Sequence, residues 1–206
     1  MKLRYSPSSP HVRKVMIVAI ETGLAERIER IPTTVAPTKP NDEVARENPL
    51  VKVPALTTDD GLVLYDSAVI CEYLDTLHDG PKLFPPPGRP RWLALRQQAL
   101  GDGLLEAALL GRYESLRPKE YQWPDWIDAQ LRKVRGALGA LEIEVEADEL
   151  GGPLTIGQVT IACALGHLDF RYASEEWRAR HRRLAAWFDE ISKRKSIELT
   201  KPKDPA

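Results

Sequence analysis

The chain has 206 residues, with 29 basic and 30 acidic side chains and a formal net charge of −1. This balance gives no reason to expect a nucleic-acid backbone as a partner. No apolar run approaches the roughly 18 residues that span a bilayer, and the first residues lack the apolar core of a signal peptide. We therefore expect a cytoplasmic protein whose partners include neither nucleic acid nor a membrane.

Cysteine and histidine are too few and too scattered for a metal or redox site. Cys71 and Cys163 are the only cysteines, and neither belongs to a CxxC pair. This pattern excludes a disulfide framework, a cysteine-based zinc site and a dithiol motif. The histidines lack the spacing of metal ligands, so we predict no metal site. They are His11, His78, His167 and His181.

The first 32 residues predict a strand, a helix and a second strand. Residues 2–5 form a short segment that ends before Pro7, and apolar residues recur at helical spacing from Pro10 to Gly23. Residues 26–32 then alternate isoleucines with charges, which is typical of a strand. The length suits a βαβ unit.

The following residues predict two more strands and a helix. A polar stretch at 36–50 comes first, and apolar residues at 53–56 and 62–64 then flank an Asp-Asp-Gly sequence, which favours a tight hairpin turn. Asp66 and Ser67 precede a run of apolar residues at helical spacing, and both are preferred N-cap types. The expected order of the first part is therefore βαβ–ββα.

The second half of the chain predicts helices alone. A connector rich in proline precedes it, with Leu83 and Phe84 as its apolar anchors. The helix that starts near residue 154 is apolar on almost every side, which indicates burial within a bundle. The four helices are expected over 91–116, 125–147, from 154 onward and 178–194. The predicted domains are 1–78 and 90–206, with a linker at 79–89.

Five motifs, in this order and spacing, resemble the glutathione transferase family, and in particular its bacterial serine-type members. The motifs are "SSPHVRK" (8–14), "NPLVKVPAL" (48–56), "LYDSAVICEYL" (64–74), "KLFP" (82–85) and "LTIGQVTIACALGHLDFR" (154–171). The resemblance implies an α+β protein with a thioredoxin-like, glutathione-binding first domain. Its all-α second domain would form the pocket for the second substrate.

The same resemblance implies a homodimeric detoxification enzyme. Such an enzyme conjugates the thiol of glutathione to a small hydrophobic electrophile. Glutathione is then a co-substrate, and no cofactor is expected. The sequence does not identify the electrophile.

In this family the proline of "KVP" is cis, and the matching residue is Pro54. The resemblance implies that the backbone of Val53 pairs with the cysteinyl part of glutathione, as a short added strand. Lys52 would face the glycyl carboxylate. The sequence departs from the family pattern at the neighbouring position, because Val51 stands where the family usually has glycine. This departure affects the role expected for Lys52.

The "YDSAV" motif is expected to bind the other end of glutathione. Ser67 and the first N–H groups of the helix form an anion site. The resemblance assigns this site to the γ-glutamyl carboxylate and makes Asp66 the acceptor for the γ-glutamyl ammonium. A plain N-cap is the alternative interpretation, and the two roles are compatible.

Ser9 is the predicted catalytic residue, because it precedes Pro10 at the start of the first helix and occupies the position of the activating hydroxyl in serine-type members. A free thiol has a pKa of about 8.5. A hydroxyl that donates to the thiolate, together with the helix dipole, lowers this pKa. Ser8 is the main alternative donor, Tyr5 is a weaker one, and an ordinary helix cap remains possible for Ser9.

The residues that follow Ser9 have other expected roles. Glutaredoxin-like proteins carry C-P-x-C here, and the chain lacks both sulfurs, so exchange through a protein disulfide is disfavoured. His11 is assigned to the rim of the second-substrate pocket, with general-base catalysis as the alternative. Arg13 and Lys14 are expected on a solvated face.

In the second half, the resemblance implies that Asp102 reaches glutathione in the partner subunit of a dimer. The pocket for the second substrate is expected to include Leu105, Leu109, Arg112 and Tyr113. The alternative for Asp102 is a solvated helix carboxylate. The alternative for the pocket residues is ordinary bundle core.

Three functions fit these residues. The first is conjugation by a glutathione transferase. The second is a non-catalytic module that binds glutathione or another ligand. The third is glutathione-dependent peroxidase or isomerase chemistry with the same Ser9.

Overall fold

The computed structural model describes residues 1–39 and 41–204, and it divides into two compact units. The first unit contains Met1–Pro86 together with the chain from Lys195 onward, and the second contains Pro87–Arg194. The sequence-based expectation is 1–78, 79–89 and 90–206, whereas in this division the chain from Lys195 onward belongs to the first unit. Each unit is described by itself below.

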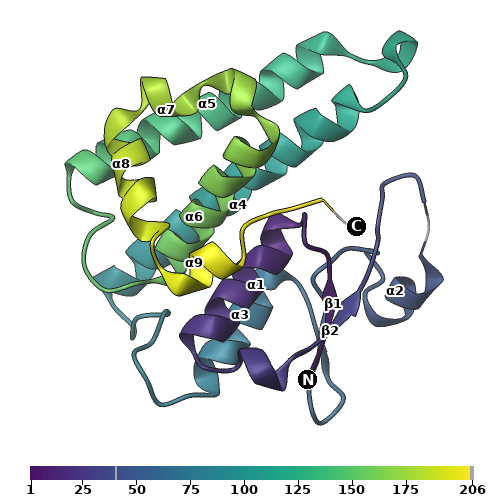
Figure 1. The fold of residues 1–206 in the computed structure, drawn as a ribbon, viewed down its shortest axis with the longest axis vertical. Helices are drawn as coiled ribbons and strands as arrows, with labels where there is room; N and C mark the ends of the chain where they lie inside the picture. Colours follow the sequence, from purple (N-terminus) through teal and green to yellow (C-terminus); the bar gives the residue numbers. More distant parts are fainter. Residues whose placement is uncertain (40, 205–206) are drawn as a thin grey trace. The chain divides into compact units, whose positions relative to one another are not determined.

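A four-stranded sheet forms the centre of the first unit (Figure 1). The strand order is β2-β1-β3-β4, in which β1 and β2 are parallel and the other neighbouring pairs are antiparallel. This is the predicted βαβ–ββα arrangement, so the thioredoxin-like class is confirmed. The strands are β1 (Lys2–Tyr5), β2 (Glu29–Pro32), β3 (Leu56–Thr57) and β4 (Val63–Leu64).

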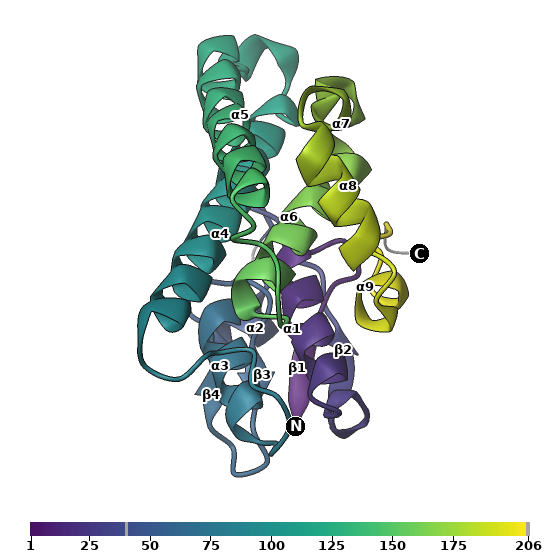
Figure 2. The same cartoon turned by 90° about the vertical axis from the view of Figure 1, so that its left-hand side faces the viewer.

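The helices of the first unit cover this sheet on two sides (Figures 1 and 2). The strands β1 and β2 lie between α2 on one side and the packed pair α1 and α3 on the other. The core includes Leu3, Ile17, Leu56 and Leu74, each fully buried. The helices are α1 (Pro10–Glu21), the 3₁₀ turn η1 (Ala25–Arg27), α2 (Asp42–Glu47), α3 (Ser67–Thr76) and α9 (Lys195–Leu199).

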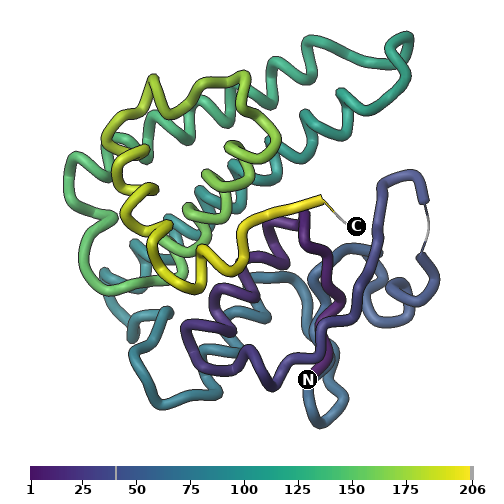
Figure 3. The backbone as a smooth tube through the Cα atoms, in the orientation of Figure 1, coloured from purple at the N-terminus to yellow at the C-terminus, as the bar shows by residue number. Residues whose placement is uncertain are grey.

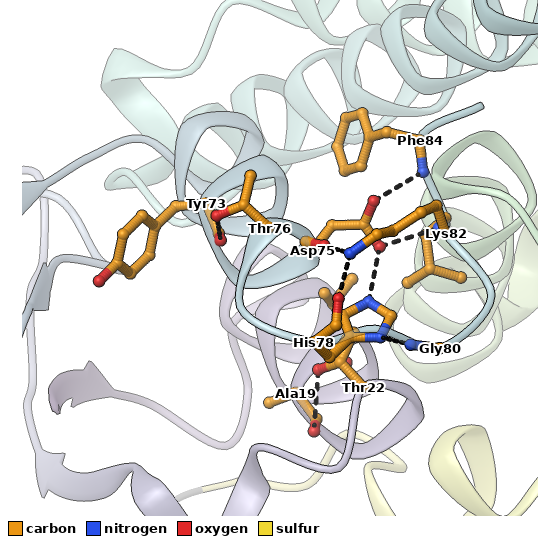
Figure 4. A network of polar contacts seen from close by, with 11 residues as sticks. Ala19, Thr22, Tyr73, Asp75, Thr76, His78, Gly80, Lys82 and Phe84 are labelled. Atoms are coloured by element: carbon orange, nitrogen blue, oxygen red, sulfur yellow. Dashed lines mark hydrogen bonds and ion pairs between the residues drawn. The ribbon is translucent and has the colours of Figure 1, made fainter. Parts of the chain in front are cut away.

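The end of α3 is joined to the "KLFP" motif by a buried carboxylate (Figure 4). Asp75 accepts hydrogen bonds from the backbone N–H groups of Leu83 (2.9 Å) and Phe84 (3.1 Å) and from Nε2 of His78 (3.2 Å). Nδ1 of His78 accepts from the N–H of Gly80 (3.1 Å), which assigns the proton to Nε2. The motif is thus held by hydrogen bonds as well as by its apolar side chains.

The second unit is helical throughout its regular structure, as predicted. Its α4 packs against α5 and α6, and every residue of α6 from Ile156 to Leu168 is buried. A Cβ at Gly101 of α4 would lie 2.9 Å from Cγ2 of Thr160 on α6, so this glycine allows the two helices to approach closely. The elements are α4 (Arg89–Ser115), η2 (Lys119–Tyr121), α5 (Pro124–Glu146), α6 (Ile156–Arg171), η3 (Ala173–Glu175), α7 (Trp177–Arg180) and α8 (Arg182–Ile191).

The helix predicted over 178–194 is interrupted at His181, which separates α7 from α8. The carboxylate of Glu142 on α5 accepts hydrogen bonds from the N–H groups of Arg183 (3.1 Å) and Leu184 (2.8 Å). The first N–H groups of α8 have no partner within their own helix, and this carboxylate from α5 accepts their hydrogen bonds. A new helix can therefore begin there. Within residues 1–39 and 41–204, no helix is long and apolar enough to cross a bilayer.

Candidate functional site

Ser9 is the N-cap residue of α1, as predicted. Its backbone is extended (φ −80°, ψ 119°), and its Oγ accepts a 3.3 Å hydrogen bond from the N–H of Val12. Pro10 occupies the first helical position, where a missing N–H leaves no bond unmade. A serine hydroxyl that accepts a bond retains its own hydrogen as a donor. Ser9 can therefore cap the helix and donate to a bound anion at the same time.

The rival hydroxyls have other neighbours. Oγ of Ser8 lies 3.4 Å from Oγ of Ser6, within hydrogen-bond reach. The guanidinium of Arg30 lies 5.8 Å from the centre of the Tyr5 ring. Tyr5 and Arg30 both line a cavity of about 250 Å³ beside α1, η1 and α9. The choice of Ser9 over Ser8 and Tyr5 stays a prediction.

The peptide bond between Val53 and Pro54 is cis, as predicted. Asn48, which is 2% exposed, holds the loop before it. Its Nδ2 donates to the C=O of Lys52 (3.0 Å), and its Oδ1 accepts from the N–H of Leu50 (3.0 Å). Sequence reasoning did not single out Asn48, although an Asn-Pro pair is a turn signal. Lys52 itself is exposed, so its side chain is available to a ligand.

Val51 has a left-handed backbone, with φ of 52°. Its N–H donates to the C=O of Asn48 (2.9 Å), which closes the turn. Glycine adopts this region without steric cost, whereas a β-branched residue there is a genuine outlier. The loop therefore keeps a conformation suited to glycine, and the valine adds strain of about 1–3 kcal/mol.

Asp66 is the N-cap residue of α3, and its Oδ1 accepts a 3.0 Å hydrogen bond from the N–H of Ala68. The peptide bond between Tyr65 and Asp66 is also cis. Asp66 is exposed, whereas Ser67 is only 2% exposed. The carboxylate thus combines a capping bond with access to solvent, which fits the compatible roles expected for it.

The topology brings these three motifs to one edge of the sheet. Leu56 of β3 pairs with β1 on one side and with β4 on the other, and both pairings are antiparallel. The end of β1, the start of β3 and the end of β4 therefore lie at the same edge. Ser9 follows β1, Pro54 precedes β3 and Asp66 follows β4, so a short connection joins each of the three residues to this edge.

The residues predicted for the second-substrate pocket and the dimer contact mostly lie on α4. Leu105 is fully buried, Leu109, Arg112 and Asp102 are partly exposed, and Tyr113 is 43% exposed. His11, in the first turn of α1, is partly exposed as well. The roles assigned to these residues stay predictions.

The expectation of a solvated face at Arg13 and Lys14 is wrong. Arg13 is 6% exposed and Lys14 is fully buried. Arg13 donates from its guanidinium to the C=O of Ile197 (3.2 Å), which belongs to the C-terminal helix α9. Nothing in the local sequence signals this contact, because its partner lies 184 residues further along the chain.

Over residues 1–39 and 41–204, no group of three or more histidine, cysteine, aspartate or glutamate side chains is arranged to hold a metal ion.

Comparison with known proteins identifies the family. Residues 8–77 match the family model "Glutathione S-transferase, N-terminal domain", and residues 124–190 match "Glutathione S-transferase, C-terminal domain". An Escherichia coli protein described as "Uncharacterized GST-like protein YibF" is 31% identical over 204 residues, which cover 98% of each chain. The chain belongs to the glutathione S-transferase family.

Two of the similar solved structures contain glutathione. A glutathione transferase family member from Pseudomonas fluorescens Pf-5, with bound glutathione, is 46% identical with a TM-score of 0.95, over 98% of each chain. A glutathione S-transferase from Methylobacillus flagellatus, with glutathione bound, is 34% identical with a TM-score of 0.87, over 98% of this chain and 99% of that one.

Proposed function

We propose that the protein conjugates glutathione to a small hydrophobic electrophile and that the hydroxyl of Ser9 stabilises the reacting thiolate. The observation that carries this proposal is the position of Ser9. It caps α1, and its Oγ accepts from Val12 while it keeps a hydrogen to donate. A sulfur anion beside this hydroxyl would also lie at the positive end of the helix dipole.

The chemical benefit follows from the acidity of the thiol. With a pKa of about 8.5, only about 3% of free glutathione is thiolate at pH 7. Each unit by which the site lowers this pKa corresponds to about 1.36 kcal/mol of preferential interaction with the anion. The thiolate sulfur then forms a bond to the electrophilic carbon. In a substitution the leaving group departs with its electron pair, and in an addition the resulting carbanion takes a proton.

Glutathione binding is assigned to the edge of the sheet where the three motifs meet. The backbone of Val53, before the cis Pro54, would pair with the cysteinyl part, and Lys52 would face the glycyl carboxylate. Asp66 and Ser67 at the start of α3 would hold the γ-glutamyl end. The similar Pseudomonas fluorescens protein, solved with glutathione and also with S-(propanoic acid)-glutathione, supports this ligand class.

The second substrate is assigned to residues of α4 and to His11 on α1. Leu105, Leu109, Arg112 and Tyr113 would line its pocket. We further propose a cytoplasmic homodimer in which Asp102 contacts glutathione bound to the partner subunit.

The experiment measures the pKa of bound glutathione from the ultraviolet absorbance of its thiolate. Ser9→Ala alone is ambiguous, because loss of a serine cap costs about 1 kcal/mol of stability. Ser9→Gly removes the hydroxyl and every other side-chain donor at a cost of only about a few tenths of a kcal/mol, because glycine is itself a good N-cap residue. Ser9→Thr keeps both the cap and the hydroxyl. We expect a lowered thiol pKa in the wild type and in Ser9→Thr, and a thiol pKa near the free value in Ser9→Gly.

Ser8→Ala is the matched control for the neighbouring hydroxyl, and it should behave as the wild type does. If Ser8→Ala loses the lowered pKa while the Ser9 variants retain it, Ser8 is the donor. Binding with an ordinary thiol pKa would favour the non-catalytic module. Absence of glutathione binding would refute every glutathione-based function. Turnover of an activated aryl halide then tests conjugation directly.

A further inference from the structure

The C-terminal residues 195–204 lie along α1 and continue to the loop that carries Ser9 (Figure 3). They belong to the same compact unit as α1, although almost two hundred residues separate them in the sequence. Ser196 and Ile197 are each 1% exposed. This segment is therefore packed into the first unit.

Two groups on α1 anchor α9. Oγ of Ser196 donates to the carboxylate of Glu21 (2.5 Å), at the end of α1. Near the other end, the guanidinium of Arg13 donates to the C=O of Ile197 (3.2 Å) and approaches Oγ1 of Thr200 (3.5 Å). The last carbonyls of a helix have no partner within it and carry a negative partial charge, so a buried guanidinium suits them. Arg13, four residues after Ser9, thus fixes the direction in which the tail leaves α9.

The tail ends against the loop before Ser9. The backbone N–H of Lys203 donates to the C=O of Pro7 (3.3 Å), two residues before Ser9. The loop also has its own turn, in which the N–H of Ser9 donates to the C=O of Ser6 (3.2 Å). The bond from Lys203 therefore acts on a short, tight connection whose last residue is Ser9.

On the side that faces the cavity, packing alone does not hold the loop before Ser9 in place. The cavity of about 250 Å³ lies directly beside it, lined in part by Ser6 and Pro7 of the loop and by Leu199 and Thr200 of the C-terminal segment. A loop that borders open space can shift without a steric clash. The hydrogen bond from the tail is consequently a larger part of what holds it.

We infer that residues 195–204 are a positioning element for the Ser9 hydroxyl. Arg13 anchors the segment to α1, and the backbone of Lys203 holds the loop at Pro7. The inference rests on the proposed function, because it concerns the direction of the hydroxyl toward the glutathione sulfur. Stabilisation of an anion by a hydroxyl depends on placement, and an error of about 1 Å in such a site can cost about 100-fold in rate.

The test removes one backbone N–H. Lys203→Pro lacks the donor, and the preceding Pro202 already has an extended preference that a following proline requires. Lys203→Ala is the matched control, since it keeps the N–H and loses only the side chain. A chain that ends at Thr200 removes the donor by another route.

For Lys203→Pro and for the shortened chain, we expect a higher pKa of bound glutathione and a fall of about 3- to 10-fold in kcat/KM near neutral pH, as for the loss of one net hydrogen bond. Lys203→Ala should match the wild type in both measurements. A role in stability alone would change the unfolding midpoint and leave the thiol pKa unaltered.

The outcomes separate this inference from the proposed function. If Ser9→Gly raises the thiol pKa but Lys203→Pro and the shortened chain do not, the inference is wrong and the proposed function stands. If Lys203→Ala has the same effect as Lys203→Pro, the backbone bond is not the cause and the inference is also wrong. An ordinary thiol pKa in the wild type overturns both.

Discussion

Replacement of Asp75 by asparagine tests whether the network at the end of α3 stabilises the first unit (Figure 4). The carboxylate is 4% exposed and accepts from two backbone N–H groups and from His78. Oδ1 accepts from the N–H of Leu83 and from Nε2 of His78, and Oδ2 accepts from the N–H of Phe84. Asparagine keeps one oxygen, so in either orientation its NH₂ group faces at least one buried N–H donor.

The expected loss follows from this count. A hydrogen bond to a charged group contributes about 1.5–3 kcal/mol, and a buried donor left without an acceptor costs about 1–3 kcal/mol. When the asparagine oxygen takes the place of Oδ1, the bond from Phe84 is lost outright, and the bonds from Leu83 and His78 are weakened because their acceptor is neutral. We expect Asp75→Asn to lower the free energy of unfolding by about 2–4 kcal/mol. For a chain of this length that corresponds to a fall of roughly 5–15 °C in the melting temperature.

The assay is urea unfolding followed by circular dichroism, with the melting temperature as a second measurement. Asp79→Asn is the matched control, because Asp79 lies in the same segment but is exposed. An exposed substitution of this kind changes stability by no more than about 0.5 kcal/mol. If Asp75→Asn falls within about 0.5 kcal/mol of Asp79→Asn, the carboxylate does not stabilise the motif and the reasoning is refuted.

Three further predictions concern stability. Gly101→Ala should destabilise the protein by about 1–3 kcal/mol, because its Cβ would meet α6, whereas Gly103→Ala, with open space around it, should stabilise α4 by about 0.5–1 kcal/mol. Equal urea midpoints would contradict this. Val51→Gly removes backbone strain of about 1–3 kcal/mol from the folded state. The greater freedom of glycine also stabilises the unfolded chain by about 0.4–1 kcal/mol. We therefore expect the free energy of unfolding to rise by about 1 kcal/mol, and a decrease would refute the strain at Val51. Hydrogen bonds from Arg4 hold the pKa of Glu47 below its ordinary value of 4.5. This stabilisation is present above the ordinary value and is lost as the pH falls through the lowered pKa. The free energies of unfolding of the wild type and Glu47→Gln should therefore differ at about pH 6 and converge as the pH falls below 4.5, and a constant difference would count against this explanation.

Local patterns in the sequence were sufficient for most of the architecture. Proline at the first position of α1, Asp66 before α3 and the Asp-Asp-Gly turn each specify a local conformation, and the structure has the corresponding element in each place. The motif around Pro54 allowed the cis bond to be predicted through the family resemblance. These features depend on a few neighbouring residues, which is why a single sequence reveals them.

The features that the sequence did not reveal depend on distant partners. In the local sequence, Arg13 has the pattern of a solvated residue. Its contact with Ile197 exists only in the folded chain. The break at His181 results from Glu142 on another helix, which caps α8. A helical periodicity reports which face of a segment is apolar, but it carries no information about a carboxylate or guanidinium that arrives from elsewhere in the fold.

The expected site depends on both kinds of feature. Each of Ser9 and Asp66 is specified locally as a cap, yet it is the strand order that places the starts of α1 and α3 at one edge of the sheet. Two helix N-termini at one edge favour a ligand that carries two separate negative groups. Glutathione, with its thiolate and its γ-glutamyl carboxylate, is such a ligand. On this argument, S-methyl glutathione should bind in the same place but lose the contribution of the Ser9 hydroxyl. At pH 8, Ser9→Gly should therefore weaken the binding of glutathione more than the binding of the methylated form. An equal effect on both ligands would show that Ser9 acts only as a helix cap.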